Sequence, residues 1–259
     1  MHAAWIPRLH AWLAEFRQHP SGVSSDTIAL WVSKLPPMFK KFFAEAMGAL
    51  RGMPQGAASH LETISRHADA ILGAPKQHLH EHYSPDLHID LIHYAPTVDR
   101  DFHYLLTSGM SDRPMTDGGL AIGKPLMELI LALPAHWDIS AEGFKNPITF
   151  QPVKLLKQLA RYPHANNTYF EKYHTVSIGD QPLLHPMQAI MLMPPVLVPE
   201  FREPLELPTG MSIQFMAIYL LHQDELDSKL AGDLDRLFEK FGEEEITEIY
   251  DIARPTVCH

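Results

Sequence analysis

The spacing of apolar residues changes along this chain of 259 residues. Before residue 75 it follows the period of a helix. Five large side chains near the start fall on one helical face: Trp5, Leu9, Trp12, Leu13 and Phe16. Two similar stripes begin after Ser25 and after Pro37. The pattern predicts three amphipathic helices in this part of the chain.

A fourth helix has the clearest ends. Ser59 and Glu62 have the spacing of a capping box, in which each side chain bonds to the backbone N–H of the other residue. Gly73 and then Pro75 would stop this helix. The sequence therefore predicts that residues 1–75 are entirely helical.

From about residue 85 the helical period gives way to alternation, which is typical of strands. Six segments alternate or form a short apolar run: 88–94, 101–107, 126–134, 174–179, 188–194 and 212–221. Two helices are expected among them, one from Phe150 to Tyr162 and one from Glu225 to Phe241. The inward face of the second would carry Leu226, Leu230, Leu234, Leu237, Phe238 and Phe241.

These elements indicate an α+β fold, because the strands run together and do not alternate regularly with helices. We predict a helical N-terminal region, residues 1–75, followed by a domain over residues 76–259 with a curved mixed β-sheet flanked by helices. The tryptophans and phenylalanines of the first region carry more apolar surface than isolated helices would leave exposed to water. Those helices should pack on the sheet domain or join copies of the chain into a homo-oligomer.

Acidic residues outnumber basic ones, 31 to 21, and the formal net charge is −10. Neither nucleic acid nor an anionic membrane is an expected partner, since each would be bound by a basic surface. A basic partner protein is favoured by long-range attraction. The 17 histidines make this charge sensitive to pH, because many of them would gain a proton near pH 6.

The number of cysteines and the length of the apolar runs indicate the cellular compartment in which the protein is expected. Cys258 is the single cysteine, so a disulfide within the chain is impossible and a reducing compartment is expected. The longest apolar run, "AIMLMPPVLV", is too short for a membrane helix and is broken by two prolines. The first residues lack the pattern of a secretory signal. We therefore expect a cytoplasmic protein.

The segment "GGLAIGKP", residues 118–125, has the glycine spacing of a phosphate-binding loop. Such a loop needs Ser or Thr after the lysine, to bind magnesium, and then a helix whose amides face the phosphates. Pro125 supplies neither a hydroxyl nor an amide hydrogen, so the segment predicts a surface loop. The sequence also gives little indication of a catalytic nucleophile. Ser111 does not lie in a G-x-S-x-G motif, and Cys258 is nearly terminal.

Four histidines, His78, His80, His82 and His88, lie within "HLHEHYSPDLHID". In an extended chain the first three would point to one side, as metal ligands do. No further ligand follows at a diagnostic spacing, so a solvated histidine-rich linker is the simpler interpretation. A metal-dependent enzyme built on these four residues is kept as the alternative function.

An apolar strand breaks abruptly into small and charged residues in "LLTSGMSDRPM", residues 105–115. Gly109 permits a positive φ, and the hydroxyl residues around it can bond to nearby backbone. We interpret the segment as a corner that defines the fold. Its exposed turn makes Ser111, Asp112 and Arg113 candidate contacts with a partner.

Tyr162 ends the predicted helix in "LARYPHANNTYF", and Pro163 follows it. A tyrosine in this place can be packed at the end of the helix, with its hydroxyl bonded to a neighbour. It can equally be an anchor for a partner, since tyrosine is common at the centre of interfaces. The residues alone leave both interpretations open.

Five blocks of sequence together resemble the Suppressor of fused-like family. They are "HIDLIHYAPTVDRDFHYLLTSGMSDRPM", "MELILALPAHW", "LKQLARYPHANNTYF", "HPMQAIMLMPP" and "IQFMAIYLLHQDELDSKLAGDLDRLFEKF". They occur in the order of the family over roughly residues 78 to 250. Several linked blocks are more specific than any single motif described above.

The resemblance implies a protein-binding domain with no catalytic activity and no cofactor. Eukaryotic members of the family hold a transcription factor of the Hedgehog pathway by pairing with an extended peptide, and bacterial members look like immunity proteins that neutralise toxins. In those eukaryotic members, the tyrosine of the "LARY" block contacts the peptide. An acidic residue directly before a histidine further along the chain contacts it as well. Tyr162 and His174 match this pattern, whereas Tyr173 stands where the acid would be.

We therefore predict a cytoplasmic, non-catalytic module that binds and inhibits a protein or an extended peptide, in particular a toxin. The predicted partner-binding residues are Tyr162, Tyr173, His174, Ser111, Asp112 and Arg113. Binding is expected beside the helix end at Tyr162, near the segment Asn167 to His174. No catalytic residue, metal or cofactor is expected to take part.

Overall fold

The computed structural model describes residues 59–258, apart from 82, 83, 85, 86, 122, 124 and 180. Residues Ala58–His259 form one compact unit. The three helices predicted before residue 59 lie outside the described residues. Their role in joining copies of the chain, and the boundary predicted at residue 75, therefore stay predictions.

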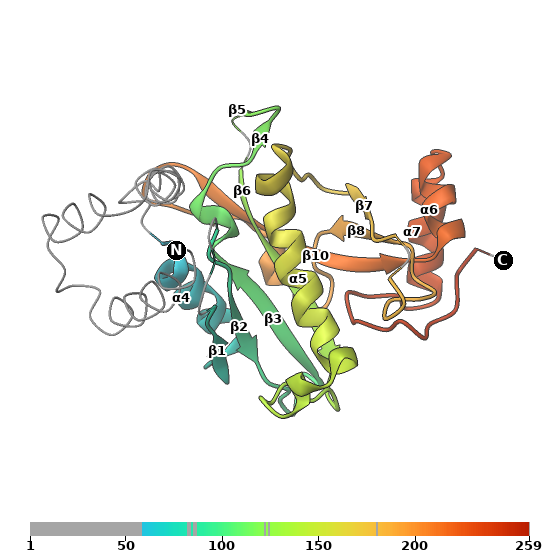
Figure 1. Cartoon of the computed structure of the whole chain (residues 1–259), viewed down its shortest axis with the longest axis horizontal. Helices are drawn as coiled ribbons and strands as arrows, with labels where there is room; N and C mark the ends of the chain where they lie inside the picture. The colour runs from blue at the N-terminus through green and yellow to red at the C-terminus, as the bar shows by residue number, and fades with distance from the viewer. Residues whose placement is uncertain are drawn as a thin grey trace, which may run out of the picture. The chain divides into compact units, whose positions relative to one another are not determined.

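Helices and strands alternate irregularly along the described chain (Figure 1). The helices are α4 (Leu61–Leu72), α5 (Pro147–Asn166), α6 (Gln223–Leu230) and α7 (Leu234–Glu243), with 3-10 turns η1 (Met110–Asp112), η2 (Gly143–Lys145) and η3 (Pro199–Arg202). The strands are β1 (Gln77–Leu79), β2 (Asp90–Tyr94), β3 (Phe102–Ser108), β4 (Thr116–Asp117), β5 (Leu120–Ala121), β6 (Leu126–Pro134), β7 (Thr175–Ser177), β8 (Ala189–Met193), β9 (Leu205–Glu206) and β10 (Ser212–Leu221). None of the helices described here is long and apolar enough to cross a membrane.

Eight of the strands form one mixed sheet in the order β1-β2-β3-β6-β10-β8-β7, with β9 paired to the start of β10. Strands β6 and β10 are parallel, and the other pairs in this sheet are antiparallel. Strands β4 and β5 form a separate hairpin. The predicted α+β fold with a mixed sheet is thus confirmed, and each of the six predicted strands forms within two residues of its expected bounds.

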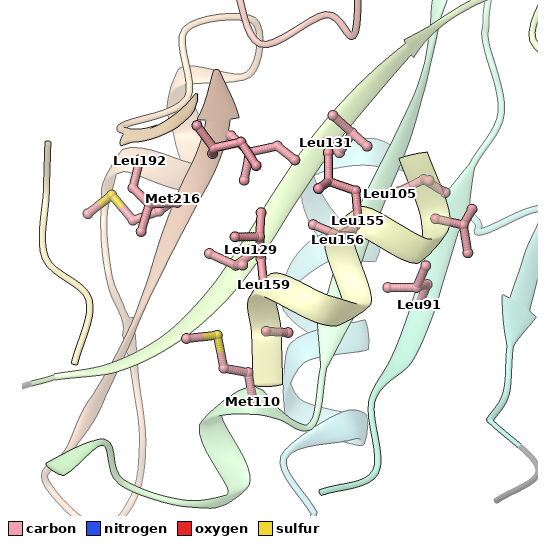
Figure 2. Close-up of a cluster of buried hydrophobic side chains, with 14 of the residues drawn as sticks. Leu91, Leu105, Met110, Leu129, Leu131, Leu155, Leu156, Leu159, Leu192 and Met216 are labelled. Atoms are coloured by element: carbon pink, nitrogen blue, oxygen red, sulfur yellow. The ribbon is translucent and has the colours of Figure 1, made fainter. Parts of the chain in front are cut away.

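Helix α5 covers one face of the sheet (Figure 1). Its Leu155, Leu156 and Leu159 pack against leucines of β2, β3 and β6, as Figure 2 shows. Those strand leucines are Leu91, Leu105, Leu129 and Leu131. Because side chains alternate along a strand, one set of positions faces α5 and the other set faces away. Burial of this apolar surface holds α5 on the sheet.

The opposite face of the sheet is covered by α4, η3 and α7. Helix α4 contributes Ile64, Ala68 and Leu72, η3 contributes Phe201, and α7 contributes Leu237 and Phe241. The strand side chains they meet are the alternate set, including Ile92, Leu106 and Ile130. Strand β6 is apolar over nearly its whole length because both of its faces are covered.

The start of α4 differs from the predicted capping box. His60, rather than Ser59, precedes the first helical turn, and its own side chain does not cap the helix. Glu62 pairs with Arg66 Nη2 at 2.6 Å instead of reaching back. The His60 N–H is bonded by the carboxylate of Asp112 at 2.8 Å. Ser59 Oγ accepts the N–H of Leu61 at 3.3 Å, so the predicted residue still contributes at this end. The bond that Glu62 was expected to make is made instead by Asp112, a side chain distant in sequence that local pattern cannot reveal.

The end of α5 was predicted one turn too early, at Tyr162. The helix continues to Asn166, although Pro163 has no N–H to donate to the Leu159 carbonyl and its ring crowds that carbonyl. The Pro163 carbonyl accepts the N–H groups of Asn167 and Thr168. Asn167 has a left-handed φ of 49°, which ends the helix. Tyr162 therefore lies within the last turns of α5.

The single helix predicted from Glu225 to Phe241 is in fact two helices, α6 and α7. Gly232 between them has a φ of +95°, which a right-handed helix cannot include. Leu230 consequently lies in solvent, 65% exposed, and the prediction that it faces inward is wrong. The other five apolar residues of the predicted inward face do pack on the core: Leu226, Leu234, Leu237, Phe238 and Phe241.

Candidate functional site

The chain turns sharply after β3 at Gly109. This glycine has a φ of +120°, and a Cβ atom there would lie 2.0 Å from the carbonyl oxygen of His88. Only glycine fits so close an approach of two backbone segments. The abrupt change of composition in residues 105–115 therefore marks a corner of the fold.

Glu128 of β6 lies fully buried beneath this corner. Its carboxylate accepts hydrogen bonds from the N–H of Gly109 at 3.0 Å and from the N–H and Oγ of Ser111 at 2.9 and 2.7 Å. Thr107 Oγ1 donates to it as well. Burial raises the pKa of Glu128, and these bonds oppose the rise because they favour the charged form. The carboxylate thus joins β3, the turn and β6.

The three candidate residues of the corner have different surroundings. Ser111 is 1% exposed and its hydroxyl bonds to Glu128. Asp112 is partly buried and bonds to the backbone of His60 at the start of α4. Arg113 is exposed. The structure thus gives Ser111 and Asp112 contacts within the fold, and a partner contact for any of the three stays a prediction.

We expect Asp112→Ala to lower the free energy of unfolding by about 1 kcal/mol, the typical effect of losing a side chain that caps a helix. The reason is that the His60 N–H loses its acceptor. Urea denaturation followed by circular dichroism measures this change. Asp101→Ala removes an exposed aspartate elsewhere on the chain and should stay within about 0.5 kcal/mol of the wild type. Equal midpoints for both variants would contradict the capping role of Asp112.

Tyr162 lies on the surface of α5 with 41% of its area exposed. Its ring stacks on Phe170, with 5.8 Å between centroids and 6° between planes. Phe170 is itself buried, 3% exposed. Two residues further along α5, His164 Nε2 bonds to the Met110 carbonyl at 3.1 Å, which ties this helix end to the corner. Tyr162 is therefore an accessible ring on a rigid support.

The chain crosses from α5 to β7 through residues 167–174. Tyr173 has a φ of 68°, which is uncommon for a residue other than glycine, and its N–H donates to the Leu192 carbonyl at 2.7 Å. Its ring packs against Phe238 of α7, with 4.9 Å between centroids. His174 Nε2 lies 3.7 Å from a carboxylate oxygen of Glu171. The structure thus places Tyr173 toward α7, while Tyr162 contacts Phe170.

A groove lies beside the crossing segment. It is lined by Pro125, Met127, Phe170, Glu171, Lys172 and Gln214. Met127 and Gln214 stand opposite each other on β6 and β10, so the sheet supplies one side of the groove. Phe170 connects the groove to the exposed ring of Tyr162. Sequence analysis missed Met127 and Gln214, because only the register of the sheet brings them together. Glu171 lies in the segment expected beside the partner but was not singled out.

Strand β7 ends the sheet next to the crossing segment. Its three residues pair with β8 on one side, and the sheet order of the described residues places no strand on the other side. Their side chains are partly buried or exposed. A free edge presents backbone N–H and C=O groups with which another extended chain can pair. An accessible aromatic ring and a free strand edge therefore lie at the two ends of one short segment.

The histidine-rich segment surrounds a carboxylate. His80 Nδ1 and His88 Nε2 lie 2.9 and 2.8 Å from the two oxygens of Asp90. Burial raises the pKa of Asp90, but the Glu81 N–H and the two histidines outweigh it and hold the pKa below its ordinary value.

The other two histidines of that segment do not complete a set of metal ligands among the described residues. His78 stacks on His80, and His82 lies outside the described residues. In the described part of the chain, no three His, Cys, Asp or Glu residues are arranged to hold a metal ion. The described residues therefore lend no support to the metal-dependent alternative. The glycine-rich segment 118–125 contributes to the β4–β5 hairpin and leads into strand β6, whereas a phosphate-binding loop leads into a helix.

Comparisons with known proteins point to one family. The sequence pattern of the family described as Suppressor of fused protein (SUFU) matches residues 85–255. No curated protein sequence gave a match.

Two solved structures share the fold. A SUFU homolog from Neisseria gonorrhoeae is 17% identical, with a TM-score of 0.52 over 76% of this chain and 95% of that chain. A chain of the Sufu–Fu complex is 15% identical, with a TM-score of 0.53 over 77% of this chain and 92% of that chain. The matched sequence pattern spans more than half of the 259 residues, and the chain therefore belongs to the Suppressor of fused family.

Proposed function

We propose that this protein is a non-catalytic module that binds a partner protein by taking an extended segment of it beside Tyr162, along the free edge of β7. The observation that carries the proposal is the juxtaposition of an exposed, supported ring with an unpaired strand edge. Strand pairing would supply affinity, and the ring would supply specificity. A structural relative occurs in a complex of Sufu with Fu, which supports a binding role.

We propose further that binding holds the partner inactive in the cytoplasm, as an immunity protein does with a toxin. The resemblance of the sequence to bacterial members of the family supports this role. The net charge of −10 supports a basic partner, because opposite charges raise the rate of encounter.

We expect Tyr162→Ala to weaken the complex by about 2 kcal/mol, or roughly 30-fold in Kd, as a truncated aromatic anchor does. The partner would be captured from the native organism, purified, and titrated by calorimetry against both forms of the protein. If the captured partner is toxic to cells, the variant should also protect them less than the wild type does.

Two further variants distinguish an anchor from a packed helix end. Tyr162→Phe keeps the ring on Phe170 and should retain most of the affinity. Leu230→Ala removes another exposed apolar side chain, on α6, and should leave binding unchanged. If Tyr162→Ala lowers only the melting temperature and leaves the Kd of the folded protein intact, Tyr162 is not the anchor.

A further inference from the structure

The chain after Tyr250 runs as a short segment, residues 251–258, against helices α6 and α7. This segment forms neither helix nor strand, and its course is the red trace that ends near those helices in Figure 1. Most of its residues are exposed or half-buried, whereas Val257 is buried. Its firmest attachments to the rest of the fold are at Arg254 and Val257.

Arg254 forms a buried ion pair with Glu225 of α6. Its Nη1 and Nη2 atoms lie 2.6 and 2.5 Å from the two carboxylate oxygens, and the two side chains are 8% and 0% exposed. Nη2 also donates to the Leu220 carbonyl of β10 at 2.8 Å. Two parallel bonds to one carboxylate fix the position of a guanidinium as well as balance its charge. Arg254 therefore joins the segment, α6 and β10 at one point.

Val257 supplies an apolar attachment to the second helix. It is 3% exposed and belongs to one cluster with Leu237 and Phe241 of α7. Its N–H donates to Glu225 Oε1 at 3.1 Å. The guanidinium carbon of Arg254 lies 5.7 Å from the centroid of the Phe241 ring, a cation–π contact. The segment thus holds α6 and α7 together.

Helix α7 in turn supports the crossing segment, residues 167–174. The ring of Phe238 packs on that of Tyr173, with 4.9 Å between centroids. Tyr173 has a φ of 68°, a conformation that persists in a residue other than glycine only where surrounding contacts enforce it. Residues 251–258 therefore act, through α7, on one of the contacts that keep Tyr173 in place.

We propose that residues 251–258 are a strap that holds α6 and α7 on the sheet and, through Phe238, keeps Tyr173 and the crossing segment in position. The strap opens as a local unit while the central strands stay folded, because a segment without helix or strand and with few buried contacts opens at a lower cost than the core. When it opens, α7 loses the contacts of Arg254 and Val257, and the crossing segment becomes more mobile. This inference goes beyond the proposed function, and its test needs no partner.

The test is amide hydrogen exchange of the purified full chain, followed residue by residue by nuclear magnetic resonance. Val257→Ala removes the apolar attachment, and the amides of α6 and α7 should then exchange roughly tenfold faster than in the wild type. The amide of Tyr173, which bonds to the Leu192 carbonyl, should become faster as well. Amides of β3 and β6 should keep their wild-type rates. Leu230→Ala truncates an exposed side chain of α6 and should leave all these rates unchanged.

Thr256→Val is a milder change, in case Val257→Ala does not fold. It removes only the hydroxyl that donates to Asp224 Oδ2 at 2.8 Å, and it should speed exchange in the same amides by a smaller factor. Tyr173→Ala removes the ring that contacts Phe238. In that background, Val257→Ala should still speed exchange in α6 and α7 but should no longer affect the crossing segment.

Three results would overturn the strap. Equal rates in Val257→Ala and Leu230→Ala would show that Val257 does not hold the two helices. Faster exchange in β3 and β6 by the same factor as in α6 and α7 would show that the whole domain opens rather than a local unit. Faster exchange in α6 and α7 with an unchanged Tyr173 amide would show that the strap does not position the crossing segment.

Discussion

Replacement of Glu128 by alanine is expected to lower the free energy of unfolding by about 3–5 kcal/mol, because several buried donors lose their acceptor and a cavity is left. The carboxylate is fully buried and accepts hydrogen bonds from the N–H groups of Gly109 and Ser111 and from two hydroxyls. Without it, these donors remain buried without an acceptor, at about 1–3 kcal/mol each where water cannot reach them. The cavity left by the side chain adds to the loss.

Urea denaturation at pH 7.5, followed by far-ultraviolet circular dichroism, measures the effect of Glu128→Ala. Glu142→Ala removes an exposed glutamate and should change stability by less than about 0.5 kcal/mol. Glu128→Gln keeps the volume and one acceptor oxygen, so its loss should fall between the two. An unfolding midpoint for Glu128→Ala equal to that of Glu142→Ala would show that the carboxylate does not hold the corner.

The strands could be predicted because alternation and burial follow from the same geometry. The run from Leu126 to Pro134 is apolar on both faces because α5 covers one face and the alternate side chains meet α4 and η3 on the other. Its one acidic residue is Glu128. An acid within a buried strand indicates that hydrogen-bond donors must surround its carboxylate. The donors themselves could not be predicted, since the register of β3 against β6 brings Thr107 close to it.

The helix ends were harder to predict, because distant residues decide them. Asp112 bonds to the start of α4 from more than fifty positions away, and no local pattern carries that information. At the end of α5, the Pro163 carbonyl accepts two N–H groups from the turn that follows, and these bonds fix where the helix stops. Gly232 was a local signal between α6 and α7 that the hydrophobic period of residues 225–241 concealed.

The candidate site was predictable only in part. Tyr162 was singled out from its sequence block, and the structure shows that its ring is exposed and stacked on Phe170. The groove could not be found, because Met127, Gln214 and Glu171 come from three separate segments. The position of Tyr173 depends on its left-handed backbone, which turns its ring toward Phe238. Sequence therefore singled out this exposed ring but not the shape around it, and a role of Tyr162 in binding stays a prediction.

Acid should destabilise this protein well before its carboxylates titrate, because several histidines are buried in their neutral form. His93 Nε2 and His103 Nδ1 are 2.9 Å apart, and His103 Nε2 bonds to the Ala135 carbonyl at 3.1 Å. If His103 donates to that carbonyl, its Nδ1 accepts from His93 Nε2, so the His103 ring is neutral. Gln77 Nε2 completes the chain at His93 Nδ1, at 3.2 Å.

Burial, followed by the charges of His103 and Lys76, lowers the pKa of His93 to about 4. Burial, followed by the charge of Arg113, also lowers the pKa of His164 to about 4, although its bond to the Met110 carbonyl opposes the shift. Burial lowers the pKa of His67 and of His103 as well. His67 lies stacked on Phe215, and no hydrogen-bond partner for its Nε2 is found among the described residues.

The sign of the effect follows from proton binding. Between pH 6.5 and pH 4 the unfolded chain protonates its histidines, whereas the folded chain keeps His93 and His164 neutral. The unfolded state thus binds more protons, and the stability present above pH 6.5 is lost as the pH falls toward 4. His93 and His164 would each remove about 2 kcal/mol of stability by pH 5, and halving this sum for water near the rings leaves about 2 kcal/mol. The lowered pKa values of His67 and His103 act in the same direction.

We therefore expect the free energy of unfolding, measured in urea, to be about 2 kcal/mol lower at pH 5 than at pH 8. The double variant His93→Gln/His164→Gln keeps a neutral donor at both positions but cannot titrate, so its loss over the same range should be less than half as large. His136→Gln changes an exposed histidine and should retain the wild-type pH dependence. Equal slopes for the wild type and the double variant would show that other groups govern the response to acid. The choice of pH 5 as the lower limit keeps ordinary carboxylates charged in the unfolded chain, so that the difference between the slopes reports on the buried histidines.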